Sequence, residues 1–285
     1  MGGLISASKK QIKNQTDVTK LTVLPKNIDI LTYSFPCQDL SQQGKQRGLG
    51  KGTRSGLLFE IERILKSNID RLPKVLVLEN VKALSTRKFI NDFNNWISVL
   101  DSIGYKTEWK VVNSIDFGSY QNRERVFAIS TLGKSLFKFP KPIKNNKNLG
   151  DLITFDKSAP TLDNLLKYNR TPFTRSSKNI TKSRLLGYTN FNSEAYLYLP
   201  VGLGPTLTAS GANSRLKFYF ENENKIQSIN SITAYQYMGF DKEDAVKVKE
   251  TNLINENKMI FTCGNSISVE VLEAIFKEII KNDLR

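Results

Sequence analysis

The first half of the chain alternates between two patterns of hydrophobic residues. Continuous apolar runs rich in β-branched residues occur at 28–34 ("IDILTYS"), 74–81 ("KVLVLENV") and 125–131 ("RVFAIST"), and each predicts a buried strand. Between them, apolar residues recur at helical spacing over 56–66 and 89–105. Strand, helix, strand, helix, strand predicts an α/β fold built on a doubly wound sheet.

From Gly133 onward the hydrophobic periodicity fades, and polar, basic and turn-forming residues take over. This change predicts a larger lobe at 1–132, a smaller lobe at 133–225 and a return to the first lobe at 226–285. The last segment closes on an amphipathic helix, which we expect to pack back on the first lobe through Val271, Leu272, Ile275, Phe276 and Ile279.

The formal net charge of +15 is unevenly distributed along the chain. Residues 133–190 hold 12 Lys and Arg against 3 Asp, a net of 12 − 3 = +9. A basic block of this kind suits a polyanion such as nucleic acid. The alternative is an ordinary solvated surface, because the chain is rich in Lys and Asn throughout.

Composition also excludes several kinds of chemistry. With two cysteines and no histidine, the chain has neither the ligand spacing of a zinc site nor a Ser-His or Cys-His pair. Two cysteines cannot form a disulfide framework, which indicates a reducing, cytoplasmic setting. No apolar run approaches the length of a membrane span and no secretory leader follows Met1, so no membrane association is expected.

Polar residues whose side chains could take part in a reaction stand where the predicted strands end or begin. Cys37 follows the strand at 28–34, Glu79 lies near the end of 74–81, and Arg123 and Arg125 stand just before the third strand. In an open parallel sheet, chemistry gathers beyond the carboxyl ends of the strands. We therefore expect Cys37 and Glu79 to converge on one cleft.

These residue types together suit addition to an electron-poor ring. A thiol is the strongest neutral-pH nucleophile of a histidine-free chain, a desolvated carboxyl with a raised pKa can donate a proton, and an arginine can hold a carbonyl. Each also has a structural explanation, because cysteines pack, glutamates cap and arginines form surface ion pairs. Cys263, which precedes Gly264 at another predicted strand end, is expected to pack.

Taken in order, the motifs resemble those of the DNA (cytosine-5) methyltransferase family. "SFPCQDLS" is similar to the family's nucleophile loop, "ENVKAL" to its glutamate motif, "QNRERVF" to its Gln-x-Arg-x-Arg motif and "GNSISVEVLEAI" to its closing helix. "GPTLTASGANSR" resembles the end of the target-recognition lobe, and the wording is most similar to bacterial CpG-specific members. The likeness, from Thr16 to the end, implies a Rossmann-like methyltransferase sheet, with 133–225 as the target-recognition lobe and the rest catalytic.

The resemblance implies transfer of a methyl group from S-adenosylmethionine to C5 of a cytosine flipped out of double-stranded DNA. Cys37 would attack C6, Glu79 would hydrogen-bond N3 in its protonated form, Arg123 would hold O2 and Arg125 would brace the loop. No side chain is evident as the base that removes the C5 proton, and a water molecule could serve.

The resemblance also implies contacts to the cofactor and to DNA. Asp17 would lie near the adenine, and the rest of the cofactor pocket would come from Pro36, Leu57, Asn265 and Ile267. The glycine-rich loop 41–51 would close over the flipped base, with Ser41 and Gln43 at the DNA and Gln43 filling the vacated stack. Further contacts would come from Ser210, Gly211, Asn213 and Arg215. Without the resemblance, Leu57 and Ile267 would be assigned to the core, and the loop residues to ordinary turns.

The chain departs from the family at its beginning. The family's first strand, its Phe-x-Gly-x-Gly loop, the acidic residue that follows and the second strand have no counterpart before Thr16. We therefore expect an N-terminally truncated methyltransferase, with low activity alone, that another polypeptide could complete. A cognate restriction endonuclease is a further possible partner.

Three rival functions stay open at this point. A relative acting on tRNA would need a smaller basic lobe. A catalytically silent DNA-binding remnant would fit the missing glycine loop but not the intact Cys37, Glu79 and Arg123. An unrelated thiol hydrolase would lack a histidine base.

Overall fold

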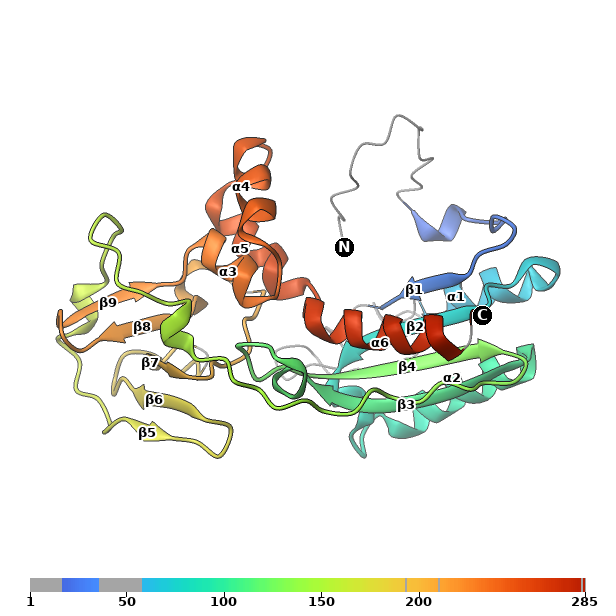
Figure 1. Ribbon diagram of the computed structural model, residues 1–285, viewed down its shortest axis with the longest axis horizontal. Coiled ribbons are helices and arrows are strands. Elements are labelled where there is room, and N and C mark those ends of the chain that lie inside the picture. Colours follow the sequence, from blue (N-terminus) through green and yellow to red (C-terminus); the bar gives the residue numbers. More distant parts are fainter. Residues whose placement is uncertain (1–16, 36–57, 193, 210, 283, 285) are drawn as a thin grey trace. The chain divides into compact units, whose positions relative to one another are not determined.

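The computed structural model describes residues 17–35, 58–192, 194–209, 211–282 and 284, which form two compact units (Figure 1). The four-stranded unit draws its described residues from 2–112, 124–141 and 275–285. The five-stranded unit draws its described residues from 113–123 and 142–274.

The four-stranded unit is built on a mixed sheet with the strand order β1-β2-β4-β3. Its strands are β1 (Ile30–Tyr33), β2 (Val75–Val81), β3 (Tyr105–Asn113) and β4 (Glu124–Leu132). β1 runs parallel to β2, whereas β4 runs antiparallel to β2 and places Phe127 opposite Glu79. The continuous apolar runs predicted β1, β2 and β4, and all three are present; β2 and β4 are mostly buried, but β1 is only half-buried, which corrects its predicted burial.

β3 is a strand that the periodicity did not predict. Its burial alternates irregularly and most of its middle is exposed, as befits a strand at the edge of the sheet. Only a short 3-10 helix (Ser114–Phe117) and no α-helix separates β3 from β4, so β4 does not continue the parallel order of a doubly wound sheet. The α/β methyltransferase class is confirmed, but the sheet is mixed.

Two helices, α1 (Leu58–Lys66) and α2 (Ile90–Ile103), pack against one face of this sheet. Their buried residues Leu65, Phe93 and Leu100 share a core cluster with Leu76 and Leu78 of β2. Burying each such side chain stabilises the fold by about 1.5–3 kcal/mol. Since side chains alternate along a strand, Val77 and Glu79 lie on the opposite face.

The five-stranded unit contains a second sheet with the strand order β5-β6-β7-β8-β9. These strands are β5 (Thr174–Arg175), β6 (Ile180–Arg184), β7 (Tyr196–Gly202), β8 (Lys217–Phe220) and β9 (Lys225–Ser228). β7 and β8 are parallel, and the other neighbours are antiparallel. The sequence predicted a separate lobe here but none of these strands, because they are short and rich in basic and aromatic residues.

Three helices belong to the same unit: α3 (Ser231–Tyr237), α4 (Lys242–Glu250) and α5 (Glu256–Asn265) (Figure 1). They share one core with β7 and β8, in which Tyr198, Phe218, Tyr237 and Cys263 are buried. The compact unit extends to Ala274. The expected return to the first lobe at residue 226 stays a prediction. Cys263 lies inside α5, which corrects its expected place at a strand end.

The last helix, α6 (Val269–Asn282), carries a buried stripe of Val271, Ile275 and Ile279. Against expectation, the stretch Glu256–Asn282 is long and apolar enough to cross a membrane by length and composition alone. That stretch comprises α5 and α6, which are separate helices whose apolar residues, such as Ile260 and Ile275, are buried in protein. Core helices pass the same test, so it is weak evidence for a membrane.

Candidate active site

The carboxyl ends of β1 and β2 are joined by side-chain hydrogen bonds. The Ser34 hydroxyl donates to the backbone carbonyl of Glu79 at 2.8 Å. The buried Asn80 amide donates to the carbonyl of Phe35 at 3.1 Å and accepts from the Val81 N–H at 2.9 Å. A buried amide with both ends engaged fixes the local backbone. The chain leaving β1 is therefore held beside Glu79.

Glu79 and Arg125 form an ion pair at this end of the sheet. The Arg125 Nε atom lies 3.3 Å from Glu79 Oε1, and the side chains are only 18% and 13% exposed. In the register, Val81 stands opposite Arg125, so Glu79 is its diagonal neighbour on the same face. Burial favours a neutral carboxyl whereas the guanidinium favours the carboxylate, so Glu79 is subject to two opposing influences.

Arg123, two positions before Arg125, has different partners. Its buried guanidinium donates to the backbone carbonyls of Leu207 at 2.8 Å, Gly264 at 2.9 Å and Ser266 at 2.7 Å. These acceptors belong to two segments far apart in the sequence. Arg123 thus ties the turn after β7 to the end of α5 within the five-stranded unit.

Gln121 and Gly264 complete this junction. The Gln121 amide is fully buried, donates to the carbonyl of Tyr237 at 3.1 Å and accepts from the Leu207 N–H at 3.2 Å. Gly264 packs so closely on the backbone of Thr208 that a Cβ atom would clash with it. Gln121 was not predicted as a functional residue, although it is the first residue of the motif "QNRER".

The expected cofactor residues are divided between the units. In the four-stranded unit, Asp17 caps a short helical turn, and hydrogen bonds from the Thr19 hydroxyl (2.7 Å) and N–H (3.0 Å) hold the pKa of its carboxyl below the usual value. In the five-stranded unit, Asn265 is exposed at the end of α5, and Ile267 is half-buried just beyond it. A carboxylate, an amide and an apolar side chain fit the polar edge and apolar face of a nucleoside. Pro36 and Leu57 lie outside the described residues.

Several expected functional residues also lie outside the described residues, namely Cys37, Ser41, Gln43 and Ser210. In the sequence, Cys37 follows Phe35 by two positions. The expected DNA contacts Gly211 and Asn213 are exposed, and Arg215 donates to the Asn257 side chain. All three belong to the five-stranded unit.

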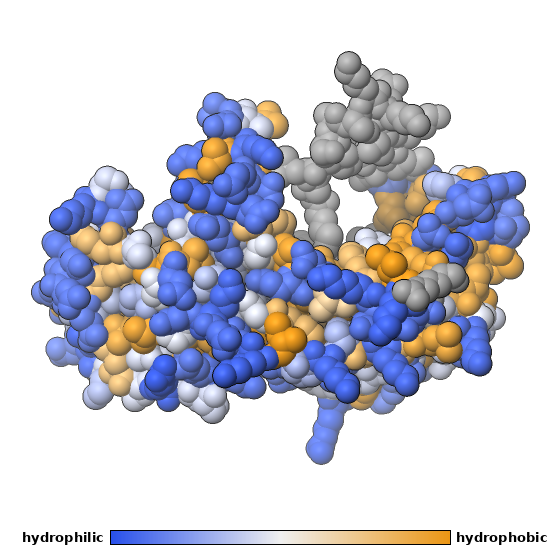
Figure 2. Space-filling view, viewed as in Figure 1, coloured by the Kyte–Doolittle hydropathy of each residue, from blue (hydrophilic) through white to orange (hydrophobic). Residues whose placement is uncertain are grey.

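The five-stranded unit interleaves cations with aromatic rings. The Arg170 guanidinium lies 4.7 Å from the ring centres of both Phe173 and Tyr219, and Lys182 Nζ lies 4.3 Å from that of Tyr196. Hydrophilic residues cover much of the visible face of this unit (Figure 2). Basic side chains supported by aromatic rings suit contact with a nucleic-acid backbone.

Neither the second thiol nor a metal offers alternative chemistry in the described part of the chain. Cys263 is only 2% exposed, and burial raises the pKa of its thiol to about 12, so it is a packing residue there. Among the described residues, no cluster of acidic and cysteine side chains could hold a metal ion.

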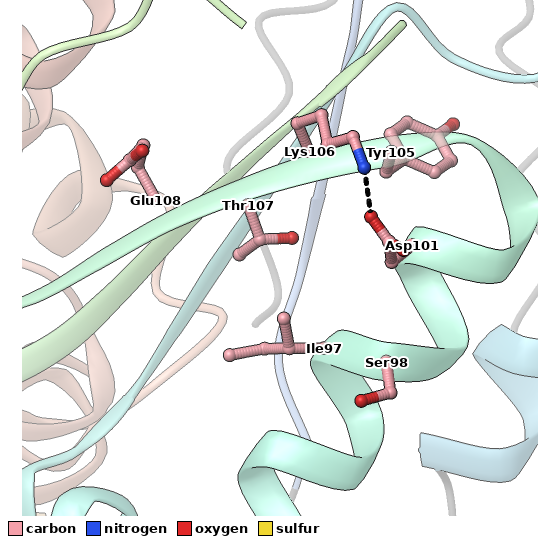
Figure 3. Close-up of a pocket in the computed structure, with 7 residues that line it drawn as sticks. All are labelled: Ile97, Ser98, Asp101, Tyr105, Lys106, Thr107 and Glu108. Carbon is pink, nitrogen blue, oxygen red and sulfur yellow. Dashed lines mark hydrogen bonds and ion pairs between the residues drawn. The ribbon is translucent and has the colours of Figure 1, made fainter.

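A surface hollow of about 390 Å³ lies between α2 and β3, where Lys106 pairs with Asp101 at 2.5 Å (Figure 3). Its lining residue Thr107 shares a hydrogen bond with Ser130, which stands opposite Leu76 in the register. Glu79 lies three residues farther along β2, about 10 Å away along the strand. The hollow therefore lies toward the other end of the sheet from the Glu79–Arg125 pair.

Comparison with known proteins gives this arrangement a family. The chain matches the C-5 cytosine-specific DNA methylase family over residues 5–281. It is 50% identical over 280 residues to the orphan methyltransferase M.SssI of Spiroplasma monobiae, covering 96% of this chain and 71% of that protein. The type II methyltransferase M2.ScrFI of Lactococcus lactis subsp. cremoris is 32% identical over 96% of this chain and 73% of its own length.

A solved structure supports the fold. The crystal structure of the S. pombe Dnmt2 methyltransferase superposes with a TM-score of 0.65 at 14% identity, covering 94% of this chain and 84% of that one. At that identity the likeness concerns the fold alone. With the family match across nearly the whole length, it leads to one conclusion: the chain belongs to the C-5 cytosine-specific DNA methylases, enzymes that methylate cytosine in DNA.

Proposed function

We propose that this chain methylates C5 of cytosine at CpG in double-stranded DNA through a covalent bond between Cys37 and C6. The observation that carries the proposal is the Glu79–Arg125 pair, held at the end of β2 beside the chain that leads to Cys37. Two residues extend a chain by at most about 7 Å, so the separation of Cys37 from Phe35 in the sequence is compatible with a role beside this pair. CpG is proposed because the motif wording is similar to CpG-specific members of the family.

In the proposed reaction, the Cys37 thiolate forms a bond to C6 while Glu79 gives a proton to N3. Electron density moves to C5, and bound S-adenosylmethionine would supply the methyl group there by cleavage of its S–CH3 bond, leaving as S-adenosylhomocysteine. Water then removes the C5 proton, the bond between sulfur and C6 breaks, and the N3 proton returns to Glu79. Cysteine and glutamate therefore end the cycle in their starting states.

The contacts support exchanging the roles that the resemblance gave to the two arginines. N3 and O2 are neighbouring acceptors on one edge of cytosine, and Glu79 and Arg125 are neighbouring side chains. We assign N3 to Glu79 and O2 to Arg125. Arg123, whose guanidinium binds three backbone carbonyls, is assigned to the five-stranded unit's own structure.

The remaining roles follow the resemblance. Asp17, Asn265 and Ile267, with Pro36 and Leu57, are proposed to hold S-adenosylmethionine. Ser41 and Gln43 are proposed to contact DNA as the base flips, and the basic five-stranded unit is proposed to bind the duplex with Ser210, Gly211, Asn213 and Arg215. A cognate restriction endonuclease is a proposed partner, since M2.ScrFI is a type II methyltransferase.

The test is a covalent trap on the purified full chain. A duplex with 5-fluorocytosine at CpG is mixed with protein and S-adenosylmethionine, because fluorine at C5 blocks release of the enzyme. We expect a denaturation-resistant adduct that requires the cofactor and disappears in Cys37→Ser. An adduct that persists in Cys37→Ser contradicts the mechanism, and an adduct formed on tRNA in preference to the duplex contradicts the substrate.

We further propose that another polypeptide supplies a strand beside β1. Within the described residues, β1 pairs only with β2, and an open strand edge is a template for pairing. Adding the N-terminal part of a related methyltransferase should then increase adduct formation. If the chain alone forms as much adduct as the mixture, no completing polypeptide is needed. If neither forms any, the protein is a DNA-binding remnant.

A further inference from the structure

Lys217, the first residue of β8, is a buried cation in the five-stranded unit. It is only 3% exposed, and desolvation lowers the pKa of its ammonium group. Burying a charge costs several kcal/mol unless hydrogen bonds compensate for the lost water. An apolar side chain would fill this strand position at no such cost, so the contacts of Lys217 need an explanation.

Among the described residues, the acceptors of the Lys217 ammonium are backbone carbonyls, and the Glu194 carboxylate adds a favourable charge. The ammonium donates to the carbonyl of Asn213 at 2.6 Å, of Glu194 at 3.1 Å and of Arg215 at 3.5 Å. An ammonium group has three donors, and each has a carbonyl within reach. Two of these carbonyls belong to the segment 211–215, which we call the recognition loop.

A second contact holds the recognition loop through the side chain of one of its residues. The Ser214 hydroxyl donates to Glu194 Oε1 at 2.9 Å, so Glu194 and Lys217 bind the same loop. Inside the loop, the Ser214 N–H donates to Gly211 at 3.0 Å and the Arg215 N–H to Ala212 at 3.3 Å. The carbonyls are thus bound on the inside, while Gly211, Ala212 and Asn213 are exposed.

We propose that Lys217 is a positioning residue that fixes the backbone of the recognition loop so that its exposed side can distinguish CpG from other cytosine contexts. This inference rests on the proposed function, because it assigns the reading of DNA to that loop. Lys217 itself touches no base. It acts by removing alternative loop conformations, and preorganisation of this kind improves discrimination as well as affinity.

The experiment compares Lys217→Met with Lys225→Met in the full chain. Lys225 lies on the neighbouring strand β9 and pairs with Asp163 at 2.5 Å, with 42% of its side chain exposed. Both variants lose one positive charge, so they have the same net charge, and a difference in sequence preference between them cannot come from net charge. Two quantities are measured: hydrogen exchange of the Ser214 and Arg215 amides without DNA, and competition binding of a CpG duplex against the same duplex carrying GpC.

We expect Lys217→Met to speed exchange of the two amides and to lower the CpG preference about tenfold, the size of one mismatched contact. Lys225→Met should leave both within about twofold, since exposed ion pairs contribute little. Lys217→Arg keeps a cation with several donors, so it should retain most of the slow amide exchange and of the CpG preference that Lys217→Met loses. A Lys217→Met protein whose loop exchange or CpG preference is unchanged overturns the proposal.

Two further outcomes are separable. If wild-type protein shows no CpG preference, the proposed target fails and, with it, the claim that Lys217 sets specificity; exchange of the loop amides still decides whether Lys217 fixes the loop. If Lys217→Met does not fold, Ser214→Ala replaces it, because this variant removes only the bond to Glu194. We expect Ser214→Ala to lower the preference about threefold, in line with the loss of one hydrogen bond, and no change would overturn the proposal.

Discussion

The two units use buried cations in different ways. In the five-stranded unit, Arg123 and Lys217 are each at least 96% buried and donate to three backbone carbonyls. In the four-stranded unit, Arg125 retains 18% exposure, pairs with the Glu79 carboxylate and donates to one backbone carbonyl, that of the adjacent Glu124, at 2.9 Å. The kind of partner, more than the depth of burial, separates a cation that shapes the fold from one available for chemistry.

The physical reason lies in what must move when a partner is exchanged. A backbone carbonyl cannot leave its cation without moving the main chain and stranding a buried polar group. A carboxylate can rotate about its side-chain bonds and accept a new partner. We therefore expect substitutions on the two sides of this comparison to separate stability from activity.

The largest expected effect is that of Glu79→Gln on activity. Glutamine keeps the size of the side chain but cannot transfer a proton, and a general acid contributes about 10²–10⁴-fold. Adduct formation should fall at least about 100-fold, with the free energy of unfolding changed by less than about 1 kcal/mol. The control is Glu124→Gln, which breaks the Glu124–Lys82 pair of 3.0 Å in the same unit. An equal loss of adduct formation in Glu79→Gln and Glu124→Gln would contradict a special role for Glu79.

A smaller effect, on stability, is expected for Gly264→Ala. The new methyl group would meet the backbone of Thr208 and displace a carbonyl that Arg123 binds. Overpacking of this kind costs about 1–3 kcal/mol of unfolding free energy, measurable by urea denaturation. Gly211→Ala is the matched control, because no described residue beyond its chain neighbours lies within 4 Å of the new position and its φ of −62° suits alanine. An equal cost in both variants would contradict the packing.

The smallest effect concerns pH and Cys263. Burial raises the pKa of its thiol from 9.0 to about 12, so the folded protein keeps a proton that the unfolded chain loses above pH 9.0. The stability contributed by this group is complete below pH 9.0 and falls as pH rises toward 12. Wild-type protein should lose stability more steeply in this window than Cys263→Ala. At about pH 8, a thiol reagent should not label Cys263 until the protein unfolds.

The sequence predicted three of the four strands of the mixed sheet, including the edge strand β1, but no strand of the second sheet. Continuous apolar runs reveal β2 and β4 because these strands are buried on both faces. β3 was not predicted because Lys106, Glu108 and Lys110 interrupt any apolar run, and β5 to β9 were not predicted because strands of two to seven residues give little periodicity. Fold class therefore follows from local pattern, whereas strand direction depends on tertiary pairing.

Part of the candidate site could be predicted in the same way. Glu79 and the two arginines stand out at strand ends, and their residue types indicate the chemistry. What could not be predicted is which arginine meets Glu79. Arg123 and Arg125 are two positions apart, and the carbonyls that engage Arg123 lie 84, 141 and 143 residues away. Only the folded chain brings those partners together.

The measurement that tests this account most directly is a paired comparison of Arg123→Lys and Arg125→Lys. Lysine keeps the charge but loses the planar set of donors, so each variant removes geometry rather than electrostatics. Unfolding free energy and covalent adduct formation are measured on both proteins. We predict that the two variants differ in opposite ways. Arg123→Lys should lose about 2 kcal/mol of unfolding free energy, because buried carbonyls lose donors. Arg125→Lys should keep its stability but form adduct at least about tenfold less. The opposite pattern, a stable Arg123→Lys without adduct and an unstable Arg125→Lys with it, would contradict the account.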